Sequence, residues 1–388
     1  MIGRDGAQLA RDPSFTILHV SQPVGVGVPH YVAELVRDQI ARGWRVAVAS
    51  PPEERPLRAA VLAAAGIHFE WRAQRKPGLS LGNEIARLRA IIRTLSPDLV
   101  HLHSSVAGLA GRLLIRGRRP TVFQPHSWSF QALQGGLGSV GAAWERLGAR
   151  WTDEIFCVSE AERLLGERVG IRARWRVVKN GVDLREFSEA DPEEKERARQ
   201  RLGLPQQTPL AVCIARLSHQ KGQDILVEVW PTVRESVADA RLFLVGDGPE
   251  SERLQWSAGP GVSLVGHRED IQDWLAASDV VALPSRWEGM SLAMLEAMAR
   301  GRSVVSTDVG GARETIGDSA GAIVERDPGQ FAAALIERLG NPALAAHEGT
   351  RARRIVEASH DVRVTLDEVA RGYRDVLSRR AGRGALPR

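Results

Sequence analysis

The chain of 388 residues contains only two cysteines and two tyrosines, and it has no apolar run long enough to cross a membrane. Cys157 and Cys213 lie within separate apolar runs, so we expect two buried free thiols and no disulfide. The apolar stretch at 59–67 is far shorter than the roughly 18 residues that a spanning helix needs. The polar N-terminus has no charged-then-apolar leader. We therefore expect a cytoplasmic protein, or one peripheral on the inner face of a membrane.

Composition and charge suggest a soluble protein of two domains. Hydrophobic residues make up 43% of the chain and charged residues 26%, and 388 residues are too many for one ordinary core. Residues 1–179 carry a net charge of +10 and residues 180–388 a net charge of −5. The basic half either meets an anionic partner, such as a membrane surface, or is plain solvated surface. We expect no nucleic-acid partner.

Short β-branched runs alternate with longer helical patterns along the chain. Several of the short runs are continuously apolar, as strands buried on both faces must be. This alternation predicts βαβ units, and hence an α/β fold of two doubly wound domains with parallel sheets. We expect helices at 29–42, 83–95, 221–236 and 291–300, and strands at 15–20, 44–50, 67–71, 99–104, 121–126, 154–159, 175–180, 210–216, 241–248, 262–267, 280–285, 303–308 and 320–325.

The boundary between the two domains is expected near 181–208, where the sequence is polar, charged and interrupted by proline. The final amphipathic segment could pack back across this boundary. We divide the chain into a disordered tail at 1–14, a first Rossmann-like domain at 15–183, a second at 184–360 and a returning helix at 361–380.

A glycine-containing loop follows the first expected strand. Gly25 and Gly27 form a G-x-G pair, but His30 stands where a dinucleotide-binding fingerprint has its third glycine. A nicotinamide site is therefore not expected. The loop either offers backbone amides to an anion at a helix N-terminus or serves only as a tight turn.

A second loop, with the sequence ARLSHQKG, places Arg216 and Lys221 between a strand and a helix. Ligands of open α/β sheets bind at this carboxyl edge of the strands. Arginine offers a planar fork and lysine a point charge, so the pair could hold a diphosphate. An Arg/Lys pair can equally be solvated surface.

The stretch RWEGMSLAMLEAMARG at 286–301 places Glu288 and Glu296 eight residues apart. A strand ends at Pro284, and the segment SLAMLEAMA is a strong helix former. Glu288 is therefore expected before the helix and Glu296 about two turns inside it, roughly 12 Å apart if all eight residues are helical, so they cannot share one metal. They could hold two ends of an elongated ligand, with free amides between them. Alternatively, Glu288 caps a turn and Glu296 faces solvent.

Taken together, these loops resemble the retaining glycosyltransferases of family 4, whose members have the GT-B fold. In that fold, two Rossmann-like domains face an interdomain cleft, and a C-terminal helix crosses back to the first domain. The resemblance extends over about 15–377, and its first half is similar to the members that build bacterial extracellular polysaccharides. It rests on the sequences HLHSSVAGLAGR, FQPHSWSF, ERLGARWTDEIFCVSEAE, KNGVDLREF, ARLSHQKG, VGDGPE, VGHRED, PSRWEGMSLAMLEAMARG and STDVGGARETI.

The resemblance implies an acceptor-binding first domain and a nucleotide-sugar-binding second domain, with roles for individual residues. Arg216 and Lys221 would neutralise the departing diphosphate, while Glu288 holds hydroxyls of the donor sugar. Glu296 would bind the ribose. His126 would contact the transferred sugar from the first domain, unless it is a structural histidine. The other donor-binding positions would be Gly289, Met290, Ser291 and Leu292 near sugar and phosphate, Gly266 and His267 at the base, and Gly27 in the loop where Val26 replaces a usual glycine.

The implied activity is that of a hexosyltransferase that retains the configuration of the sugar. It would move a sugar from a nucleotide-diphosphate sugar, a UDP-sugar first, to a hydroxyl of a glycan, a lipid-linked glycan or a small molecule, in polysaccharide or glycoconjugate biosynthesis. The sequence contains no Asp-x-Asp, so we expect no metal and no cofactor; Arg216, Lys221 and a helix N-terminus replace the metal's charge. The alternatives are glycosylation of a small natural product, a degenerate nucleotide-sugar-binding protein, and an epimerase or phosphorylase.

The acceptor side of the protein is expected at 128–151. Its aromatic and basic residues either meet a lipid-linked acceptor at a membrane surface or are ordinary core and rim residues. A basic cluster at 111–120 is a second candidate for contact with anionic lipid. The residues concerned are Trp128, Phe130, Trp144, Trp151, Arg146 and Arg150 in the first segment, and Arg116, Arg118 and Arg119 in the second.

Overall fold

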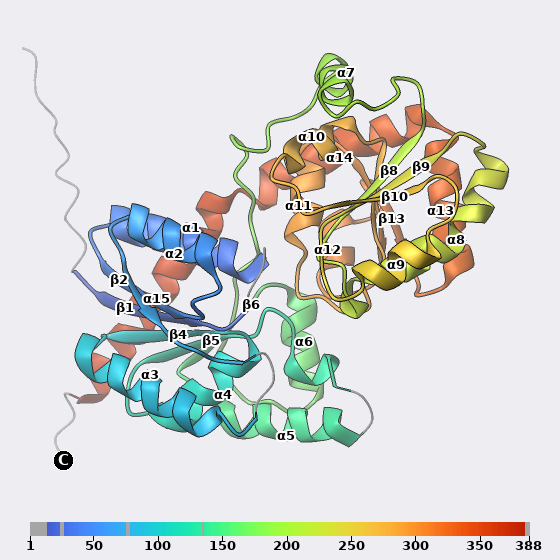
Figure 1. The fold of residues 1–388 in the computed structure, drawn as a ribbon. Helices are drawn as coiled ribbons and strands as arrows, with labels where there is room; N and C mark the ends of the chain where they lie inside the picture. The colour runs from blue at the N-terminus through green and yellow to red at the C-terminus, as the bar shows by residue number, and fades with distance from the viewer. Residues whose placement is uncertain (1–13, 24–26, 75–77, 134–135, 385–388) are drawn as a thin grey trace, which may run out of the picture.

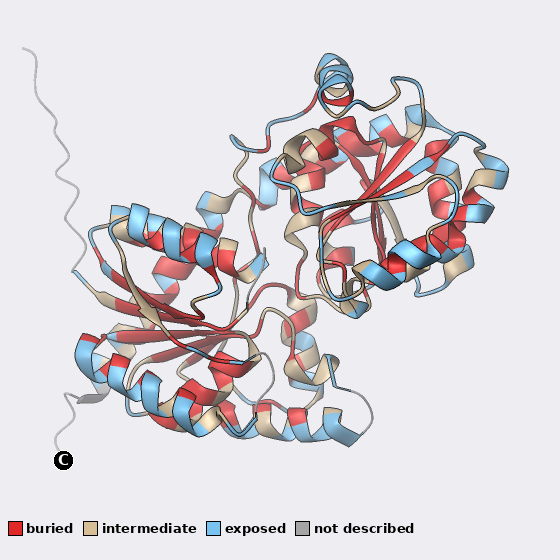
Figure 2. Cartoon of the chain, viewed as in Figure 1, coloured by how far each residue is buried: buried red, intermediate tan, exposed pale blue. Residues whose placement is uncertain are grey.

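A computed structural model describes residues 14–23, 27–74, 78–133 and 136–384. Two α/β domains lie side by side, each built around one parallel sheet, and the chain passes between them after residue 177 and again before residue 362 (Figure 1). The sheets are buried, whereas the helices around them expose one side to solvent (Figure 2). This arrangement confirms the expected fold of two facing Rossmann-like domains.

The sheet of the first domain has seven parallel strands in the order β3-β2-β1-β4-β5-β6-β7. The chain starts in the middle of this sheet, builds outward to β3, and then crosses back to build the other side. That reversal places the carboxyl ends of β1 and β4 next to each other. The strands are β1 (Thr16–Ser21), β2 (Arg45–Ser50), β3 (Ile67–Glu70), β4 (Leu99–His103), β5 (Thr121–Gln124), β6 (Glu154–Cys157) and β7 (Trp175–Val177).

Helices cover both faces of this sheet. One face packs against α3, α4 and α5 through residues such as Leu88 and Val106, and the other packs against α1, α2 and α15 through Leu35, Leu57 and Tyr373. The helices of this domain are α1 (Gly27–Ala41), α2 (Arg55–Ala63), α3 (Leu81–Leu95), α4 (Ser104–Ile115), the short η1 (Ser129–Gln131), α5 (Gly136–Ala149) and α6 (Glu160–Arg168).

The second domain repeats the plan with six parallel strands in the order β10-β9-β8-β11-β12-β13. These strands are β8 (Leu210–Ile214), β9 (Arg241–Val245), β10 (Val262–Gly266), β11 (Val280–Leu283), β12 (Ser303–Thr307) and β13 (Gly321–Val324). The helices are η2 (His219–Lys221), α8 (Gln223–Ser236), α9 (Ser251–Ser257), α10 (Ile271–Ala277), α11 (Leu292–Ala299), α12 (Ala312–Ile316), α13 (Pro328–Leu339) and α14 (Pro342–Ser359). All thirteen strands that the apolar runs predict are present.

The last helix, α15 (Val362–Gly384), leaves the second domain and packs on the first (Figure 1). Val369, Tyr373 and Val376 are buried in the core of the first domain. Gly372 lies against the sheet so closely that a Cβ atom there would be 2.4 Å from the Phe156 ring. Ion pairs such as Arg176–Asp375, at 2.6 Å, tie the helix to the first domain, which confirms the expected crossing.

The segment between the domains is more ordered than its polar composition suggests. Pro192–Arg201 forms α7, which the sequence reading treats only as boundary. Asp191 caps this helix by accepting a hydrogen bond from the Glu194 amide at 2.7 Å, and proline occupies the first turn. Eight of its ten residues are polar or charged, the others being Pro192 and Ala198, so no hydrophobic periodicity marks it. It packs against α10 through Ala198.

Both cysteines are buried and free, as the apolar runs around them predict. Across the part of the chain that the structure describes, no helix combines the length and the apolar character needed to cross a bilayer.

Candidate active site

The loop that follows β8 carries Arg216 and Lys221 to the carboxyl edge of the second sheet. It turns through η2 into α8 at Gly222, which has a φ of +69°. A Cβ atom at Gly222 would lie 2.1 Å from the carbonyl oxygen of Pro284, so only glycine fits this contact. The loops after β8 and β11 therefore pack directly on each other, and Lys221 reaches the second one.

Glu288 lies at the junction of these two loops. Its carboxylate forms an ion pair with Lys221 and accepts a hydrogen bond from the Ser285 hydroxyl at 2.8 Å. Arg216 differs, because no ion pair or side-chain hydrogen bond joins its guanidinium to any residue that the structure describes. A half-buried arginine without a partner is a cation available to an anionic ligand.

The helix after Glu288 begins with free amides. Ser291 caps α11, its hydroxyl accepting a hydrogen bond from the Met294 amide at 3.4 Å. Within the described ranges, no acceptor is paired with the backbone amides of residues 289–292. Unpaired amides at a helix N-terminus favour negative charge, so this end of α11 suits a phosphate or a sugar oxygen.

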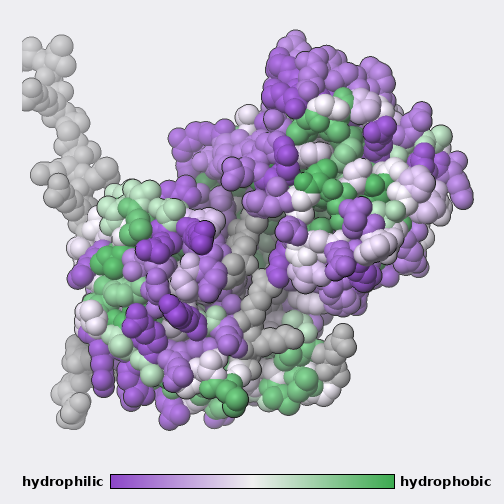
Figure 3. All heavy atoms as spheres, viewed as in Figure 1, coloured by the Kyte–Doolittle hydropathy of each residue, from purple (hydrophilic) through white to green (hydrophobic). Residues whose placement is uncertain are grey.

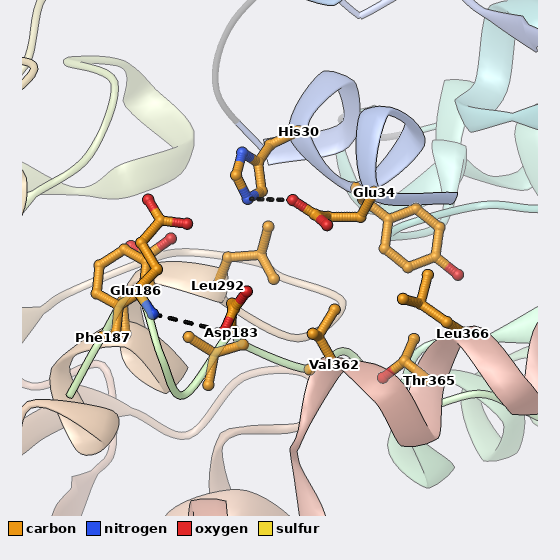
Figure 4. A pocket seen from close by; sticks show the side chains of 13 residues that line it. His30, Glu34, Asp183, Glu186, Phe187, Leu292, Val362, Thr365 and Leu366 are labelled. Carbon is orange, nitrogen blue, oxygen red and sulfur yellow. Dashed lines mark hydrogen bonds and ion pairs between the residues drawn. The ribbon is translucent and has the colours of Figure 1, made fainter. Parts of the chain in front are cut away.

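Glu296 lies on α11 facing a cavity between the domains. The cavity has a volume of about 480 Å³, part of it open to solvent. Figure 4 shows α1, the segment around Asp183, α11 and the start of α15 meeting around it. Burial, together with the nearby Glu186, raises the pKa of Glu296 to about 7. No hydrogen bond or ion pair to another described residue occupies its carboxylate, so the carboxylate is available to a ligand.

His126 faces the second domain from the loop after β5, and its backbone is strained. The φ angles of His126 and Ser127 are +56° and +122°, which non-glycine residues rarely adopt. Glu162 supports this loop, because its backbone carbonyl oxygen accepts a hydrogen bond at 2.7 Å from the ring of Trp128, two residues after His126. Its buried carboxylate accepts a hydrogen bond from the Val158 amide at 2.8 Å. Burial lowers the pKa of His126 to about 3, so its ring is neutral at physiological pH. Strain of this kind is typical of functional positions.

The two loops meet across the domain boundary. A Cβ atom at Gly289 would lie 2.7 Å from a methyl group of Val158 and 3.1 Å from the carbonyl carbon of His126. The Ser159 hydroxyl and the carbonyl oxygen of Gly289 are 3.4 Å apart. The structure thus brings His126 and the Glu288 loop together from opposite domains, as the family resemblance implies.

Three further residues join the domains at this place, and the sequence reading assigns none of them. The carboxylate of Glu314 accepts hydrogen bonds at 3.2 Å from the first two amides of α6. Asn180 donates to the carbonyl oxygen of Met290 at 2.9 Å, and Lys179 lies 3.8 Å from Glu314. Their motifs, KNGVD and GGARETI, are visible in the sequence, but the partners come from opposite domains.

The other positions that the sequence predicts for donor binding, Gly27, Gly266 and His267, are exposed to solvent. Gly266 ends β10 with a φ of +72°, and His267 follows it at the exposed edge of the second sheet. Gly27 is the exposed first residue of α1, with open space where a side chain would stand. Gly25 and Val26 lie outside the described residues.

In the segment at 128–151, expected on the acceptor side, the aromatic side chains pack against other residues and do not form its exposed apolar surface. Trp128 is a core residue, and its ring nitrogen donates to the carbonyl oxygen of Glu162 at 2.7 Å. Trp144 and Trp151 pack on each other with ring centroids 6.2 Å apart. The exposed apolar side chains of this segment are aliphatic instead: Leu133, Leu137, Val140 and Leu147.

The arginines at 116–119 also make hydrogen bonds to backbone carbonyl oxygens. Arg116 and Arg118 bond to carbonyl oxygens in the last turn of α4, at 2.8–3.1 Å, and Arg119 bonds to the carbonyl oxygen of Pro97 at 3.0 Å. Cations at a helix C-terminus stabilise it, so these residues are more than a free basic surface.

Comparisons with known proteins identify the family of the chain. A model described as Glycosyltransferase Family 4 matches residues 26–186, and one described as Glycosyl transferases group 1 matches residues 208–341. The D-inositol 3-phosphate glycosyltransferase of Xylanimonas cellulosilytica is 32% identical over 313 residues, which cover 72% of each chain. The chain belongs to glycosyltransferase family 4.

Other relatives of this family 4 chain match over shorter stretches. The GDP-mannose-dependent monoacylated alpha-(1-6)-phosphatidylinositol monomannoside mannosyltransferase of Corynebacterium glutamicum is 36% identical over 192 residues, or 46% of this chain and 50% of the relative. The chain therefore spans about half the length of such relatives. Among solved structures, Anabaena HepE in complex with UDP and glucose superposes with a TM-score of 0.80 at 21% identity, covering 93% of this chain and all of HepE. That similarity establishes the GT-B fold.

Proposed function

We propose that this family 4 chain is a glycosyltransferase that takes a sugar from a nucleotide-diphosphate sugar and passes it to an acceptor hydroxyl in glycoconjugate biosynthesis. One observation carries the proposal. Across the domain boundary, the strained His126 loop lies against the loop that holds Glu288, and that loop is paired with Lys221. The arrangement presents cations, free amides, a carboxylate and a neutral imidazole to one ligand.

Each group suits one part of such a donor. Arg216 and Lys221, with the amides at the start of α11, would hold the diphosphate and stabilise it as it leaves. Glu288 would bind sugar hydroxyls, and Glu296 would bind the ribose. A UDP-sugar is the first candidate, with the base near Gly266 and His267. Phosphate charge is matched by side chains and amides here, so we propose that transfer needs no metal.

The bond changes can balance without an enzyme nucleophile. The acceptor oxygen would form a bond to the anomeric carbon on the face from which the diphosphate departs. The bond from that carbon to the diphosphate oxygen would break, and the acceptor proton would pass to the leaving phosphate. We propose that the sugar therefore retains its anomeric configuration. The neutral ring of His126 would position a hydroxyl of the bound sugars and would not carry charge during transfer.

The acceptor side of the first domain presents an apolar surface. Leu137 and Val140 on α5 are 63% and 64% exposed, and Arg146 on the same helix is also exposed. Figure 3 shows hydrophobic side chains gathered along this edge of the first domain. An exposed apolar strip beside basic groups suits a membrane surface, so we propose a lipid-linked acceptor, delivered at a membrane.

A screen of nucleotide sugars tests the proposal. The purified protein is incubated with UDP-, GDP- and ADP-sugars, and binding and slow hydrolysis are measured before acceptors are added to the best donor. We expect one donor to be hydrolysed and then transferred, with the product anomer matching the donor. Tight nucleotide binding without any turnover would favour a binding protein. Interconversion of donor sugars without acceptor would favour an epimerase, and a strict need for inorganic phosphate would favour a phosphorylase.

A further inference from the structure

A row of hydrogen-bonded histidines runs behind His126 through the first domain. The Nε2 atom of His126 is 3.0 Å from Nδ1 of His103, and Nε2 of His103 is 3.0 Å from Nδ1 of His19. The Nε2 atom of His19 is 2.9 Å from the side-chain oxygen of Gln39. The rings lie nearly parallel, with angles of 24° and 25° between neighbours. The row thus links the cleft to α1 through an unbroken series of contacts.

The sheet order explains how these residues meet. β1 and β4 are neighbouring parallel strands, and their register pairs Ser21 with His103 and His19 with His101. His19 and His103 therefore stand near the carboxyl ends of adjacent strands, beneath α1, which supplies Gln39. His19, His103 and Gln39 are all buried. Buried polar side chains destabilise the folded protein unless they are hydrogen-bonded. The hydrogen bonds within the row therefore fix the positions of its side chains.

The end of the row gives it a direction. A neutral imidazole has one nitrogen that donates and one that accepts. With the side-chain oxygen of the Gln39 amide assigned to the end that faces His19, this oxygen accepts, so Nε2 of His19 carries the proton and Nδ1 of His19 accepts. His103 must then donate from Nε2 and accept at Nδ1, and His126 must donate from Nε2. The same logic leaves Nδ1 of His126 without a proton.

We propose that Gln39, His19 and His103 are positioning residues that hold His126 in its Nε2–H tautomer, so that Nδ1 accepts a hydrogen bond from a hydroxyl of the bound sugars. The role of His126 toward sugar rests on the proposed function, but its tautomer does not. Burial lowers the pKa of His19 to about 4 and that of His103 well below its usual value, so neither ring breaks the row by taking a second proton at physiological pH. The tautomer of His126 is thus set by Gln39, which lies behind His103 and His19 in the row.

A metal ion is the competing explanation for part of this cluster. His19, His101 and His103 each offer a nitrogen within 4.8 Å of the others. Two of these side chains, however, are already joined at 3.0 Å through ring nitrogens, and Nδ1 of His101 is 2.5 Å from the Tyr373 hydroxyl. Atoms at such separations are hydrogen-bonded to each other, and we therefore favour the row over a cation site.

The experiment reads the tautomer directly. Two-bond ¹H–¹⁵N correlation spectra of the full chain distinguish the protonated from the bare nitrogen of each histidine ring, and His126→Gln assigns the His126 signals. We expect the Nε2–H tautomer in the wild-type protein. Gln39→Met, which removes the acceptor but keeps the size of the side chain, should give mixed tautomers at His126. His68→Phe is the matched control, because His68 bonds to Ser50 on a neighbouring strand outside the row.

Kinetics complete the test once a donor is known. Gln39→Met should lower kcat by about tenfold or more, the size of effect seen when a residue that orients a working group is lost, with the KM of the donor within about twofold. A wild-type His126 protonated at Nδ1, or one unchanged in Gln39→Met, would overturn the proposal. Stoichiometric zinc in the purified protein that is lost in His101→Phe would overturn it as well. Absence of transfer with the expected tautomer would contradict only the proposed function.

Discussion

The ammonium group of Lys221 and the carboxylate of Glu288 form an ion pair between the loops that follow β8 and β11. The Ser285 hydroxyl donates a hydrogen bond to the same carboxylate oxygen. The proposed function requires Lys221 for phosphate and Glu288 for sugar hydroxyls. When the donor binds, the ion pair between Lys221 and Glu288 must therefore break or weaken. The phosphate end and the sugar end of the donor both replace this single interaction. The pair thus couples the two halves of the proposed donor site.

The first prediction follows from this coupling. Glu288→Gln frees Lys221, so the affinity for the free nucleoside diphosphate should stay within about fivefold of the wild-type value, on the tighter side. Sugar transfer should fall by about 10²-fold, because a contact made to the reacting sugar is lost. Isothermal titration calorimetry and initial rates measure the two quantities. Glu296→Gln serves as the comparison, and an equal loss of nucleotide affinity in both variants would contradict the assignment.

The second prediction concerns the pH dependence of Glu296, whose pKa is raised to about 7 by burial and by Glu186. If the carboxylate accepts hydrogen bonds from the ribose, nucleotide affinity should increase between pH 6 and pH 8 as Glu296 ionises. Nucleotide phosphates also titrate in this range, so the measurement is the difference between the wild-type protein and Glu296→Gln. The difference in nucleotide affinity between the wild-type protein and Glu296→Gln should be larger at pH 8 than at pH 6. A gap that does not change with pH would contradict the role.

The same variant makes a statement about stability. A carboxyl whose pKa is higher in the folded state costs stability as the pH rises from its unfolded value of 4.5 through about 7. Glu296→Gln removes that cost, so its Tm at pH 8 should exceed that of the wild-type protein by about 2 °C. The two proteins should converge below pH 4.5, where the carboxyl group is uncharged in both the folded and the unfolded chain. A variant that is less stable at pH 8 would show that the carboxylate has a stabilising partner.

The third prediction concerns the contact between the domains. Gly289→Ala places a Cβ atom 2.7 Å from a methyl group of Val158 and 3.1 Å from the His126 backbone. The Val158 side chain must then shift and the His126 backbone must give by a few tenths of an ångström. Because a misplacement of about 1 Å can reduce the rate about 10²-fold, we expect a smaller but measurable fall in kcat/KM. Gly82→Ala is the matched control, because its Cβ atom would meet open space. Equal kcat/KM values in the two variants would contradict direct contact between the loops during transfer.

The fourth prediction tests the apolar edge of the first domain. The wild-type protein should co-sediment with vesicles that contain anionic lipid and be released by salt, since basic residues beside an apolar strip attract such surfaces. Leu137→Asp with Val140→Asp should abolish this binding and leave nucleotide affinity unchanged. Leu62→Asp changes a residue that is also exposed, at 53%, but lies on α2. If the Leu62 variant loses as much binding as the α5 variant, α5 is not the docking surface.

The arginines at 116–119 are a less informative choice for that experiment. The sequence marks them as a basic cluster, but Arg116 and Arg118 bond to carbonyl oxygens at the end of α4. Their replacement would loosen the helix as well as remove charge. The two effects could not be told apart.

Much of the fold could be predicted because buried parallel strands have a strong local signal. The runs that become β8 and β11, for example, are continuously apolar, and each is followed by a loop and a helix. Loops with distinctive residues, such as those with Lys221 and Glu288, could likewise be placed at the sheet edge from the sequence. Helix α7 could not be recognised in the same way, since its stability comes from capping by Asp191 and from packing on α10 rather than from an apolar stripe.

Contacts between distant segments could not be predicted, because they depend on register and on how the domains meet. His19 and His103 are 84 residues apart, and only the pairing of β1 with β4 brings their rings to 3.0 Å. Glu314 bonds to the start of α6 from 153 residues away. For a similar reason, the sequence could not decide between an acceptor contact and a core position for Trp128, since its burial depends on α6.

The central claim is that Arg216 and Lys221 take the place of a metal ion on the donor diphosphate. The measurement that tests it most directly is the rate of donor turnover in excess chelator, for the wild-type protein and for Arg216→Ala, with Arg253→Ala as a control on an exposed arginine paired with Glu250. We predict that the wild-type protein and the control keep their full rate in chelator, whereas Arg216→Ala loses about 10²-fold or more. A wild-type rate that vanishes in chelator and returns with a divalent cation, or an Arg216 variant as active as the control, would contradict the claim.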